Sequence, residues 1–294
     1  YLIKRYKLRN VYITAFPFSA MLVGILLKKC LGDKIFWVAD YRDGWQFEPL
    51  IETVLPDWRM RFIRMMDTLV LRHCDKAVFV TGPIRNQYLE AYPWLSKKAE
   101  LITNGYDEDD FQALAPRSFQ TPTLVYMGKV YNLRRPNLLP LLDALKRSGK
   151  NIPLVHIGSL SPDARDQIER NGYDFYSFKG YKAHHEALSI AAGASVNLLL
   201  LNDDRVSEGV YTGKVFELLR LGIPILALGP KRGLVKELIE TSGAGVYVPL
   251  RDTDAILPAL QKLMENPGGF MCKPDVMRGF ERSCLTEQLA ALYD

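Results

Sequence analysis

The stretch GVYTGKVFELLRLGIPILALGP, residues 209–230, decides the fold prediction because it joins a helix directly to a strand. Residues 213–221 have a helical pattern, and the proline-headed run 223–229 has the composition of a buried strand. Lys214 and Glu217 lie three residues apart in the helix and therefore share one face, although the helix is otherwise mostly apolar. The sequence thus raises the question of what this charged pair faces.

Strands and helices alternate in the same way along most of the chain, which is typical of βαβ units and parallel sheets. The predicted fold class is therefore α/β. The strands are predicted at 11–16, 35–41, 76–82, 99–105, 123–130, 152–158, 173–180, 194–201, 223–229 and 244–250. The helices are predicted at 18–31, 57–73, 83–92, 136–148, 162–171, 183–192, 213–221, 232–241 and 252–265, with a terminal helix after them.

The domain organisation follows from one polar segment. Residues 107–123 contain two prolines and no clear period, and they are predicted to link two Rossmann-like doubly wound domains. The predicted domains are a partial first domain at 1–115, a complete second domain at 116–275 and a C-terminal helix at 276–294. Because the first domain has few predicted strands and the chain begins without methionine, we expect an N-terminal portion to be missing.

Composition excludes several classes of protein. With 48% hydrophobic and 24% charged residues, the 294-residue chain is globular and not disordered. Its apolar runs are too short to cross a bilayer. Four scattered cysteines, Cys30, Cys74, Cys272 and Cys284, indicate neither a zinc site nor a disulfide framework, so a reducing cytoplasm fits best. The net charge of +5 is compatible with phosphate-bearing substrates or acidic membranes and does not require nucleic acid.

Two tandem domains of this kind bind ligands outside the carboxyl ends of their strands, so the site is predicted between the domains. Gly128 and Lys129 end the first strand of the second domain, and Arg134 and Arg135 precede the next helix. Cations beside a helix N-terminus suit a diphosphate, although a solvated loop explains them too. Gly158 and Ser159 end another strand, where a close approach to a ligand or a plain turn is expected.

In the first domain, Asp40, Arg42 and Asp43 follow an apolar strand. They either form a structural ion-pair network or orient an acceptor hydroxyl at the reaction centre. His156 lies inside a strand and is expected in the core, whereas His184 and His185 begin a helix and are expected as surface or capping residues. We find no Ser/His/Asp or Cys/His grouping, P-loop or GxGxxG motif, and no predicted metal site.

The helix predicted at 57–73 combines arginines with large apolar residues. A basic amphipathic helix can rest on anionic lipid, but it can also pack on a core with its charged face in water, and both interpretations remain open. The residues concerned are Arg59, Arg61, Arg64, Arg72, Trp58 and Phe62.

Taken together, seven motifs give the chain a recognisable pattern. It resembles the family-4 glycosyltransferases of the GT-B fold, especially bacterial members that build surface polysaccharides, although the family's glycine-rich first loop is absent. The motifs are VYITAFPFSA (11–20), WVADYRDGW (37–45), ITNGYD (102–107), LVYMGKVY (124–131), FKGY (178–181), YTGKVFELLRLGIPILALGP (211–230) and TSGAG (241–245).

The resemblance implies transfer of a sugar from a nucleotide-diphosphate sugar to the hydroxyl of a lipid-linked or polysaccharide glycan, with retention and without a metal or cofactor. It also implies a cytoplasmic location at the inner face of the cytoplasmic membrane. Asp40, Arg42 and Asp43 are the implied catalytic residues. The implied donor-binding residues are Gly128, Lys129, Arg134, Arg135, Gly158, Gly180, Tyr181, Lys182, Glu208, Thr212, Gly213, Lys214 and Glu217.

Within that set the resemblance assigns separate roles. Lys129, with Arg134 or Arg135, would bind the donor phosphates, Glu217 the ribose hydroxyls, and residues 180–182 the base. Lys214 takes the lysine position of the Gly-Lys-x-x-Glu variant. The first acid of the family's Glu-x7-Glu pair would fall on Gly209, and Glu208 stands one residue before it. Two alternatives remain open: a sugar-nucleotide 2-epimerase, and a fragment that binds nucleotide sugars without turnover.

Overall fold

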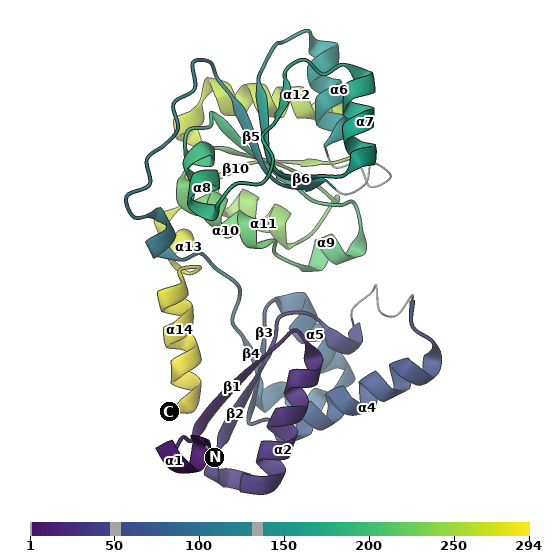
Figure 1. Cartoon of the computed structure of the whole chain (residues 1–294), viewed down its shortest axis with the longest axis vertical. Coiled ribbons are helices and arrows are strands. Elements are labelled where there is room, and N and C mark those ends of the chain that lie inside the picture. Colours follow the sequence, from purple (N-terminus) through teal and green to yellow (C-terminus); the bar gives the residue numbers. More distant parts are fainter. Residues whose placement is uncertain (1, 48–53, 131–137) are drawn as a thin grey trace. The chain divides into compact units, whose positions relative to one another are not determined.

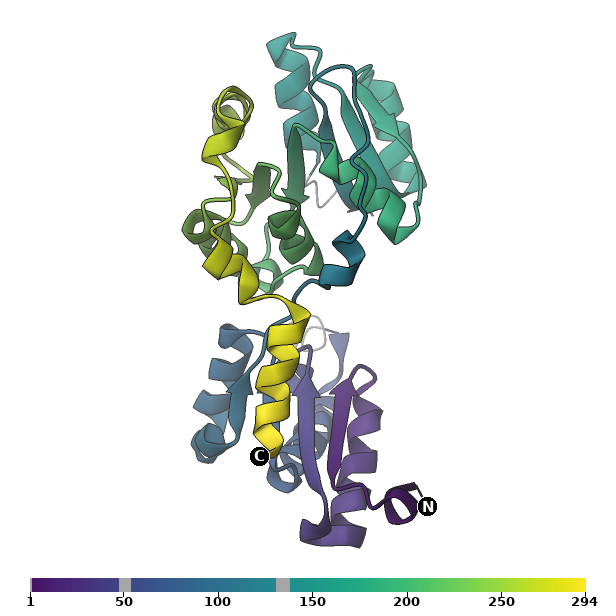
Figure 2. The ribbon, with the colours of Figure 1, turned by 90° about the vertical axis from the view of Figure 1, so that its left-hand side faces the viewer.

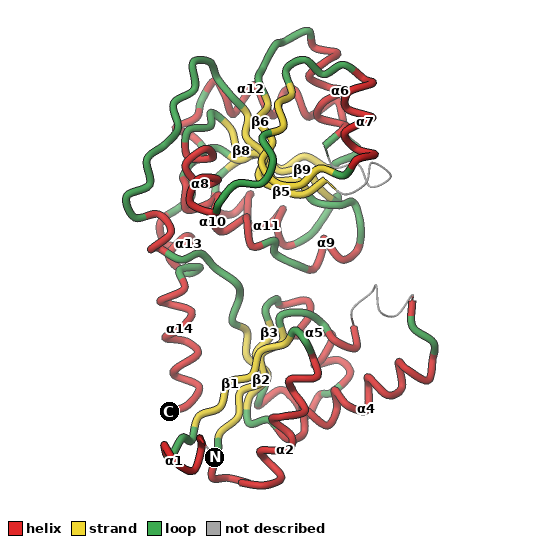
Figure 3. Tube along the Cα trace, in the orientation of Figure 1, coloured by secondary structure: helices red, strands yellow, loops and turns green. Residues whose placement is uncertain are grey.

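The computed structural model describes residues 2–47, 54–130 and 138–294. The chain forms two compact units (Figure 1). The first unit combines the chain up to Asn104 with Ser283–Asp294, and the second unit consists of residues 105–282. Helices and strands alternate through both units (Figure 3). The first unit contains a four-stranded sheet and the second a six-stranded sheet, and every pairing in both sheets is parallel. The structure therefore confirms the predicted α/β class.

The second unit is a doubly wound sheet. Its strand order is β10-β9-β8-β5-β6-β7, so β5 lies between β6 and β8 and the winding direction reverses beside β5. Sheets with this topology bind ligands at that reversal, outside the carboxyl ends of the strands. The strands are β5 (Leu124–Val130), β6 (Leu154–Leu160), β7 (Tyr176–Phe178), β8 (Val196–Leu200), β9 (Ile225–Gly229) and β10 (Gly245–Pro249).

Helices cover both faces of this sheet (Figure 1). Alternate strand residues point to opposite faces, so Leu226 and Leu228 of β9 join one core cluster while Ile225 and Ala227 join the other. On the first face lie α6 (Leu139–Ser148), α7 (Pro162–Asn171) and α12 (Thr253–Glu265). On the second lie α8 (His184–Ala192), α10 (Gly213–Leu221) and α11 (Leu234–Ser242). The short helices of this unit are α9 (Arg205–Gly209) and α13 (Pro274–Arg278).

The first unit has the strand order β1-β2-β3-β4. Its strands are β1 (Asn10–Ala15), β2 (Phe36–Tyr41), β3 (Lys76–Phe79) and β4 (Ala99–Leu101). Its helices are α1 (Leu2–Tyr6), α2 (Met21–Leu31), α4 (Asp57–His73), α5 (Gly82–Ala91) and α14 (Arg282–Ala290).

The two faces of the four-stranded sheet are covered by different parts of the chain. The C-terminal α14 lies over one face (Figure 2), where Leu285 packs with Val38 and Val78. On the opposite face α2 approaches the sheet very closely, because a Cβ atom at Gly24 would lie 2.1 Å from the ring of Trp37. A glycine at this position allows the helix to rest directly on the buried indole.

All ten predicted strands are present, and the long predicted helices are found within a few residues of their expected bounds. Within the described residues, three short α-helices were not predicted as separate elements: α1, α9 and α13 have five residues each, which is too short for a hydrophobic period to emerge. The unit boundary falls at 104/105, whereas the predicted domain boundary is at 115/116. Tyr106 and Phe111 explain the difference, because both are buried in the core of the second unit.

The predicted C-terminal helix at 276–294 is divided between the units, since α13 belongs to the second and most of α14 to the first. Among the residues that the structure describes, none of the helices has the length and apolar character needed to cross a bilayer.

Candidate functional site

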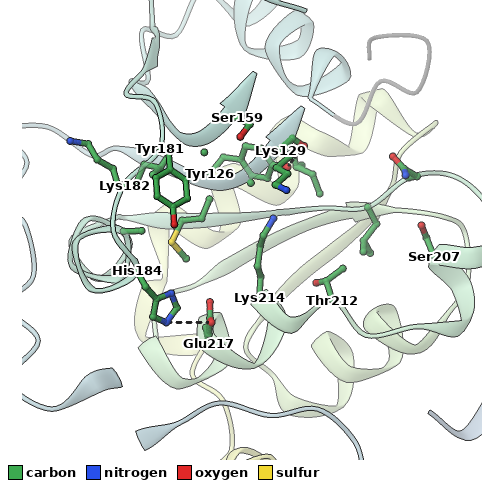
Figure 4. A pocket seen from close by; sticks show the side chains of 18 residues that line it. Tyr126, Lys129, Ser159, Tyr181, Lys182, His184, Ser207, Thr212, Lys214 and Glu217 are labelled. Atoms are coloured by element: carbon green, nitrogen blue, oxygen red, sulfur yellow. Dashed lines mark hydrogen bonds and ion pairs between the residues drawn. The ribbon is translucent and has the colours of Figure 1, made fainter. Parts of the chain in front are cut away.

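A pocket of about 620 Å³ lies in the second unit, at the carboxyl ends of β5, β6 and β8 and beside the start of α10 (Figure 4). This is the place where the winding of the sheet reverses. The pocket is lined by Tyr126, Met127, Gly128, Lys129, Ile157, Gly158, Ser159, Tyr181, Lys182, His184, Ala187, Leu200, Leu201, Asn202, Ser207, Thr212, Lys214 and Glu217.

Two glycines from neighbouring strands keep one wall of the pocket open. Gly128 and Gly158 are partners in the β5–β6 register. A Cβ atom at Gly158, whose φ is +134°, would lie 1.9 Å from the carbonyl oxygen of Gly128. A Cβ atom at Gly128 would lie 2.3 Å from the Tyr126 hydroxyl and 2.9 Å from Lys214 Nζ. Gly158 therefore excludes any side chain because its neighbour is backbone, whereas a side chain at Gly128 would have to displace the Tyr126 ring and the Lys214 amine.

The Lys214 amine occupies the middle of the pocket (Figure 4). It lies 5.8 Å from the centre of the Tyr126 ring, a cation–π distance. Burial lowers the pKa of Lys214, the nearby Lys129 lowers it further, and Glu217 acts in the opposite direction. A half-buried ammonium group held close to a second cation favours an anionic ligand, because an anion restores the solvation that Lys214 has lost and offsets the repulsion by Lys129.

Glu217 stands one turn further along α10 and faces the same pocket. Burial raises the pKa of its carboxyl group, Asp110 raises it further, and His184 and Lys214 lower it. His184 Nε2 lies 3.7 Å from Glu217 Oε1 and 3.3 Å from Asp110 Oδ2. Glu217 thus presents an acceptor of hydrogen bonds beside a cation and an imidazole.

The start of α10 contributes polar groups of its own. The first hydrogen bond of this helix runs from the Val215 amide to the Thr212 carbonyl, so the amides of Gly213 and Lys214 precede it. The Thr212 hydroxyl lines the pocket and is buried, yet among the described residues it has no hydrogen-bond partner. Buried polar atoms are rarely left unpaired, which indicates that a ligand or water completes this end of the pocket.

The loop after β7 forms the opposite rim. The Gly180 carbonyl accepts a hydrogen bond from the Gly158 amide (2.9 Å), and Gly180 has a φ of +69°, which favours glycine. This turn carries Tyr181, which is 83% exposed, over the pocket (Figure 4). Lys182 Nζ pairs with Glu186 of α8 at 2.9 Å.

His156 supports the site from behind. It is fully buried, as the sequence predicted, and its Nε2 lies 3.0 Å from the Gly128 carbonyl oxygen. That carbonyl can only accept, so Nε2 carries the proton and Nδ1 accepts from the Tyr176 hydroxyl at 2.6 Å. Burial lowers the pKa of His156 to about 4, and the neutral imidazole fixes the end of β5.

The pocket brings together most of the predicted donor-binding residues. Gly180 and Gly213 are absent from the pocket lining, although each adjoins a residue that lines it. Arg134 and Arg135 lie outside the described residues. The predicted residues in the lining are Gly128, Lys129, Gly158, Tyr181, Lys182, Thr212, Lys214 and Glu217.

Glu208 lies elsewhere. Its carboxylate pairs with the Arg232 guanidinium at 3.1 Å, and the pocket residue of α9 is instead Ser207. Gly233 allows α9 to approach this closely, because a Cβ atom there would lie 2.7 Å from the Glu208 carbonyl oxygen. The acid one residue before the family's position is thus turned toward α11.

Sequence analysis missed several lining residues. His184 is half exposed at the start of α8, in keeping with the prediction, but its ring also lines the pocket. No sequence pattern marked Tyr126, Ser207 or Asn202 as a site residue. The position of Asn202, two residues after the end of β8, was the available clue, because strand ends on both sides of the reversal contribute to such sites.

In the first unit, Asp40 and Arg42 form the ion-pair network that was one of the two predicted interpretations. Asp40 is fully buried, and its Oδ2 accepts from Arg42 Nε at 2.6 Å and from the Tyr12 hydroxyl. Arg42 also donates to Asn104 Oδ1 at 2.6 Å. Asp40 Oδ1 is buried without a hydrogen-bond partner in the described part of the chain, and Asp43 is exposed.

A second buried acid lies behind this segment and was not predicted. Asp67 of α4 accepts hydrogen bonds from the Tyr41 and Tyr88 hydroxyls, at 2.8 and 2.6 Å, and from the Gln46 amide at 2.9 Å. Burial raises the pKa of Asp67 to about 6, while these three donors lower it. Since Tyr41 and Gln46 flank the turn with Arg42 and Asp43, the network fixes the shape of that turn.

No protein-family model matches the sequence, and neither does any curated protein. Solved structures do match it, over nearly the whole chain. Sucrose-phosphate synthase from Thermosynechococcus elongatus covers 99% of this chain and 74% of its own, with a TM-score of 0.67 and 17% identity. HepE from Anabaena, solved with UDP, covers 96% of this chain and 78% of its own, with a TM-score of 0.71 and 15% identity.

A glycosyltransferase from Rickettsia africae covers 99% of this chain and 78% of its own, with a TM-score of 0.71 and 14% identity. HepE was also solved with UDP-glucose. These likenesses show that the fold matches GT-B glycosyltransferase structures. In the described ranges, no group of three or more His, Cys, Asp or Glu side chains is placed to hold a metal ion.

Proposed function

We propose that the protein is a glycosyltransferase that moves a sugar from a nucleotide-diphosphate sugar to an acceptor hydroxyl. One observation carries the proposal: Lys214 and Glu217 project from one face of α10 into a pocket walled by the bare backbone of Gly128 and Gly158. A cation suits a diphosphate and a carboxylate suits the paired hydroxyls of ribose, so the two ligand groups are matched in one cavity.

The diphosphate is proposed to bind at the start of α10. The Gly213 and Lys214 amides, the positive end of the helix dipole and the buried Thr212 hydroxyl are all suited to phosphate oxygens. The Lys214 ammonium would neutralise charge, assisted by Lys129 at the end of β5. As the sugar departs, negative charge grows on the diphosphate, and these fixed groups would stabilise it in the transition state.

The ribose is proposed to bind at Glu217. A carboxylate can accept from two hydroxyls at once, whereas an amide offers a single acceptor oxygen. His184 and Lys214 both favour the ionised form of Glu217 against the effect of burial. The base is proposed to lie against the turn at 180–182, where the exposed ring of Tyr181 offers an apolar surface.

The acceptor is proposed to bind to the first unit, at Asp40, Arg42 and Asp43. Arg42 and Asp40 hold one another in place, and the exposed carboxylate of Asp43 remains as the acceptor for a hydroxyl proton. We further propose retention at the anomeric carbon, no requirement for a metal, and a lipid-linked or polysaccharide glycan as acceptor. The matching structures support the nucleotide-sugar donor, since HepE was solved with UDP and with UDP-glucose.

Product analysis with radiolabelled UDP-sugars and a lipid-linked acceptor tests this proposal. Transferred sugar is the expected product, and Lys129→Ala should abolish transfer with the fold intact, because a donor-phosphate cation is lost. Lys231→Ala, at an exposed position outside the pocket, is the control. An epimerised donor, nucleotide binding without any product, or normal turnover of Lys129→Ala would each contradict the proposal.

A further inference from the structure

A buried acid of the first unit, Asp67, lies on α4 behind the turn that carries Arg42 and Asp43. Its side chain is fully buried, and the three groups that donate hydrogen bonds to it are all uncharged. Neutral donors offset only part of the hydration that a buried carboxylate loses, and burial accordingly raises the pKa of Asp67. The way in which the donors are divided between the two carboxylate oxygens explains why an acid stands here.

The two oxygens of Asp67 bind opposite ends of one turn. Tyr41, the last residue of β2, donates to Oδ1 at 2.8 Å. Gln46, in the 3-10 helix Trp45–Phe47, donates to Oδ2 at 2.9 Å. We call residues 41–46 the acceptor turn. An ionised carboxylate accepts on both oxygens, whereas an amide accepts on only one, so a carboxylate is suited to hold both ends of the acceptor turn at once.

The third donor to Asp67 comes from outside the acceptor turn. Tyr88 lies on α5, and its hydroxyl donates to Oδ2 at 2.6 Å. The rings of Tyr88 and Tyr41 are both fully buried and pack with their centroids 5.3 Å apart. The two tyrosines therefore have the same burial and the same hydrogen-bond acceptor, but only Tyr41 is part of the acceptor turn.

Asp43 is the residue of the acceptor turn that depends most on the backbone. Its side chain is exposed, and within the described ranges its carboxylate makes no hydrogen bond or ion pair. Arg42 differs, because its guanidinium is held by Asp40 and by Asn104, each at 2.6 Å. The place of the Asp43 carboxylate is therefore set by the backbone of the turn, whose two ends are bound to Asp67.

We propose that Asp67 is a positioning residue: it fixes both ends of the acceptor turn and thereby sets where the Asp43 carboxylate meets the acceptor hydroxyl. The proposal rests on the function proposed above, in which Asp43 accepts the hydroxyl proton. Displacement of a reacting group by about 1 Å can lower a rate about a hundredfold. Asp67 can therefore control turnover without touching the substrate.

Hydrogen–deuterium exchange of the acceptor turn tests the proposal without any substrate. The reporters are the amides of Trp45 and Phe47, which donate hydrogen bonds to carbonyl oxygens of the turn at 3.1 and 2.7 Å. Tyr41→Phe and Gln46→Met each release one end of the turn, so exchange at the reporter amides should rise at least about tenfold. Asp67→Asn removes one of the two acceptor oxygens and should have the same effect.

Tyr88→Phe is the matched control. Like Tyr41→Phe, it deletes one buried hydroxyl that donates to Asp67 and keeps the aromatic ring. The melting temperatures of the two variants should therefore lie within about 3 °C of one another. Because Tyr88 is not part of the acceptor turn, exchange at the reporter amides should stay within about twofold of the wild type in Tyr88→Phe.

Sugar transfer and UDP affinity are measured on the same variants, with radiolabelled UDP-sugars and the lipid-linked acceptor. In Tyr41→Phe and in Gln46→Met kcat should fall at least about tenfold. UDP affinity by calorimetry should stay within about twofold, because the proposed UDP pocket belongs to the second unit. Tyr88→Phe should keep kcat within about threefold of the wild type.

Unchanged exchange in both Tyr41→Phe and Gln46→Met would overturn the proposal, and so would an equal rise in Tyr88→Phe, which is the result expected of a merely structural network. Raised exchange with an unchanged kcat would overturn it as well. Absence of transfer by the wild type would instead refute the proposed function, and the exchange comparison would still decide whether Asp67 fixes the acceptor turn.

Discussion

Acidification should destabilise the second unit through one residue, His156. In the folded protein burial lowers its pKa from 6.5 to about 4, because the imidazole is enclosed between Tyr176 and the Gly128 carbonyl. Between these two values the unfolded chain binds a proton that the folded chain does not, so stability present above about pH 6.5 is lost as the pH falls toward 4. A difference of about 2.5 in pKa corresponds to roughly 3 kcal/mol in the free energy of unfolding.

Urea unfolding at about pH 7 and about pH 4.5 measures this loss. All four tryptophans, Trp37, Trp45, Trp58 and Trp94, belong to the first unit, so tryptophan fluorescence follows that unit alone. Far-ultraviolet circular dichroism follows both units, and the transition that fluorescence does not report belongs to the second. Between the two pH values this transition should lose roughly 2 to 3 kcal/mol.

His156→Gln is the matched variant, because glutamine can donate to Gly128 and accept from Tyr176 but does not titrate over this range. Its second transition should lose about 2 kcal/mol less than that of the wild type between the same two pH values. If the second transition loses the same free energy in wild type and His156→Gln, then His156 is not a neutral buried imidazole in the folded protein. Its assigned role in fixing the end of β5 would fall with it.

Three further results are expected. Asp67 has its pKa raised from 3.8 to about 6, so the folded first unit binds a proton that the unfolded chain does not and should gain about 2 kcal/mol in stability between pH 6 and pH 4. Tryptophan fluorescence measures this gain; a loss there, or the same gain in Asp67→Asn, would contradict the buried network. Gly158→Ala should destabilise the second unit by more than about 2 kcal/mol in urea unfolding and abolish UDP binding, because the new Cβ atom would meet the Gly128 carbonyl oxygen. Gly213→Ala is the control and should fold normally, because no atom lies within 4 Å of its Cβ position. His184→Asn should weaken UDP binding several-fold by calorimetry, because its ring lines the pocket with Nε2 3.7 Å from Glu217 Oε1; unchanged affinity would exclude this role.

Hydrophobic periodicity and residue composition were sufficient to predict most of the helices and strands from the sequence. Long runs such as IPILALG are buried on both faces in parallel sheets, so they stand out from the polar segments between them. Five-residue helices such as α9 do not repeat often enough to be recognised, and their positions depend on contacts such as that between Gly233 and Glu208. The unit boundary depends in the same way on where Tyr106 and Phe111 are buried.

The candidate site was predicted in part for the same physical reason. Gly128 and Gly158 were recognisable because strand ends converge at the reversal of the sheet, whereas the position of Lys214 was implied by the resemblance to a known family. His184 and Asp67 were not, because their surroundings come from segments distant in sequence, such as Asp110 for His184 and Tyr41 for Asp67. A tertiary contact of this kind leaves no pattern near the residue itself.

Isothermal titration calorimetry with UDP tests the central claim, that the pocket beside α10 binds a nucleoside diphosphate. Wild-type protein should bind UDP, and Lys214→Met and Glu217→Gln should each weaken binding at least about tenfold, or 1.4 kcal/mol. Lys231→Met and Glu237→Gln, at exposed positions outside the pocket, are the matched controls and should bind as the wild type does. No heat of binding in the wild type, or equal affinity in all five proteins, would contradict the claim.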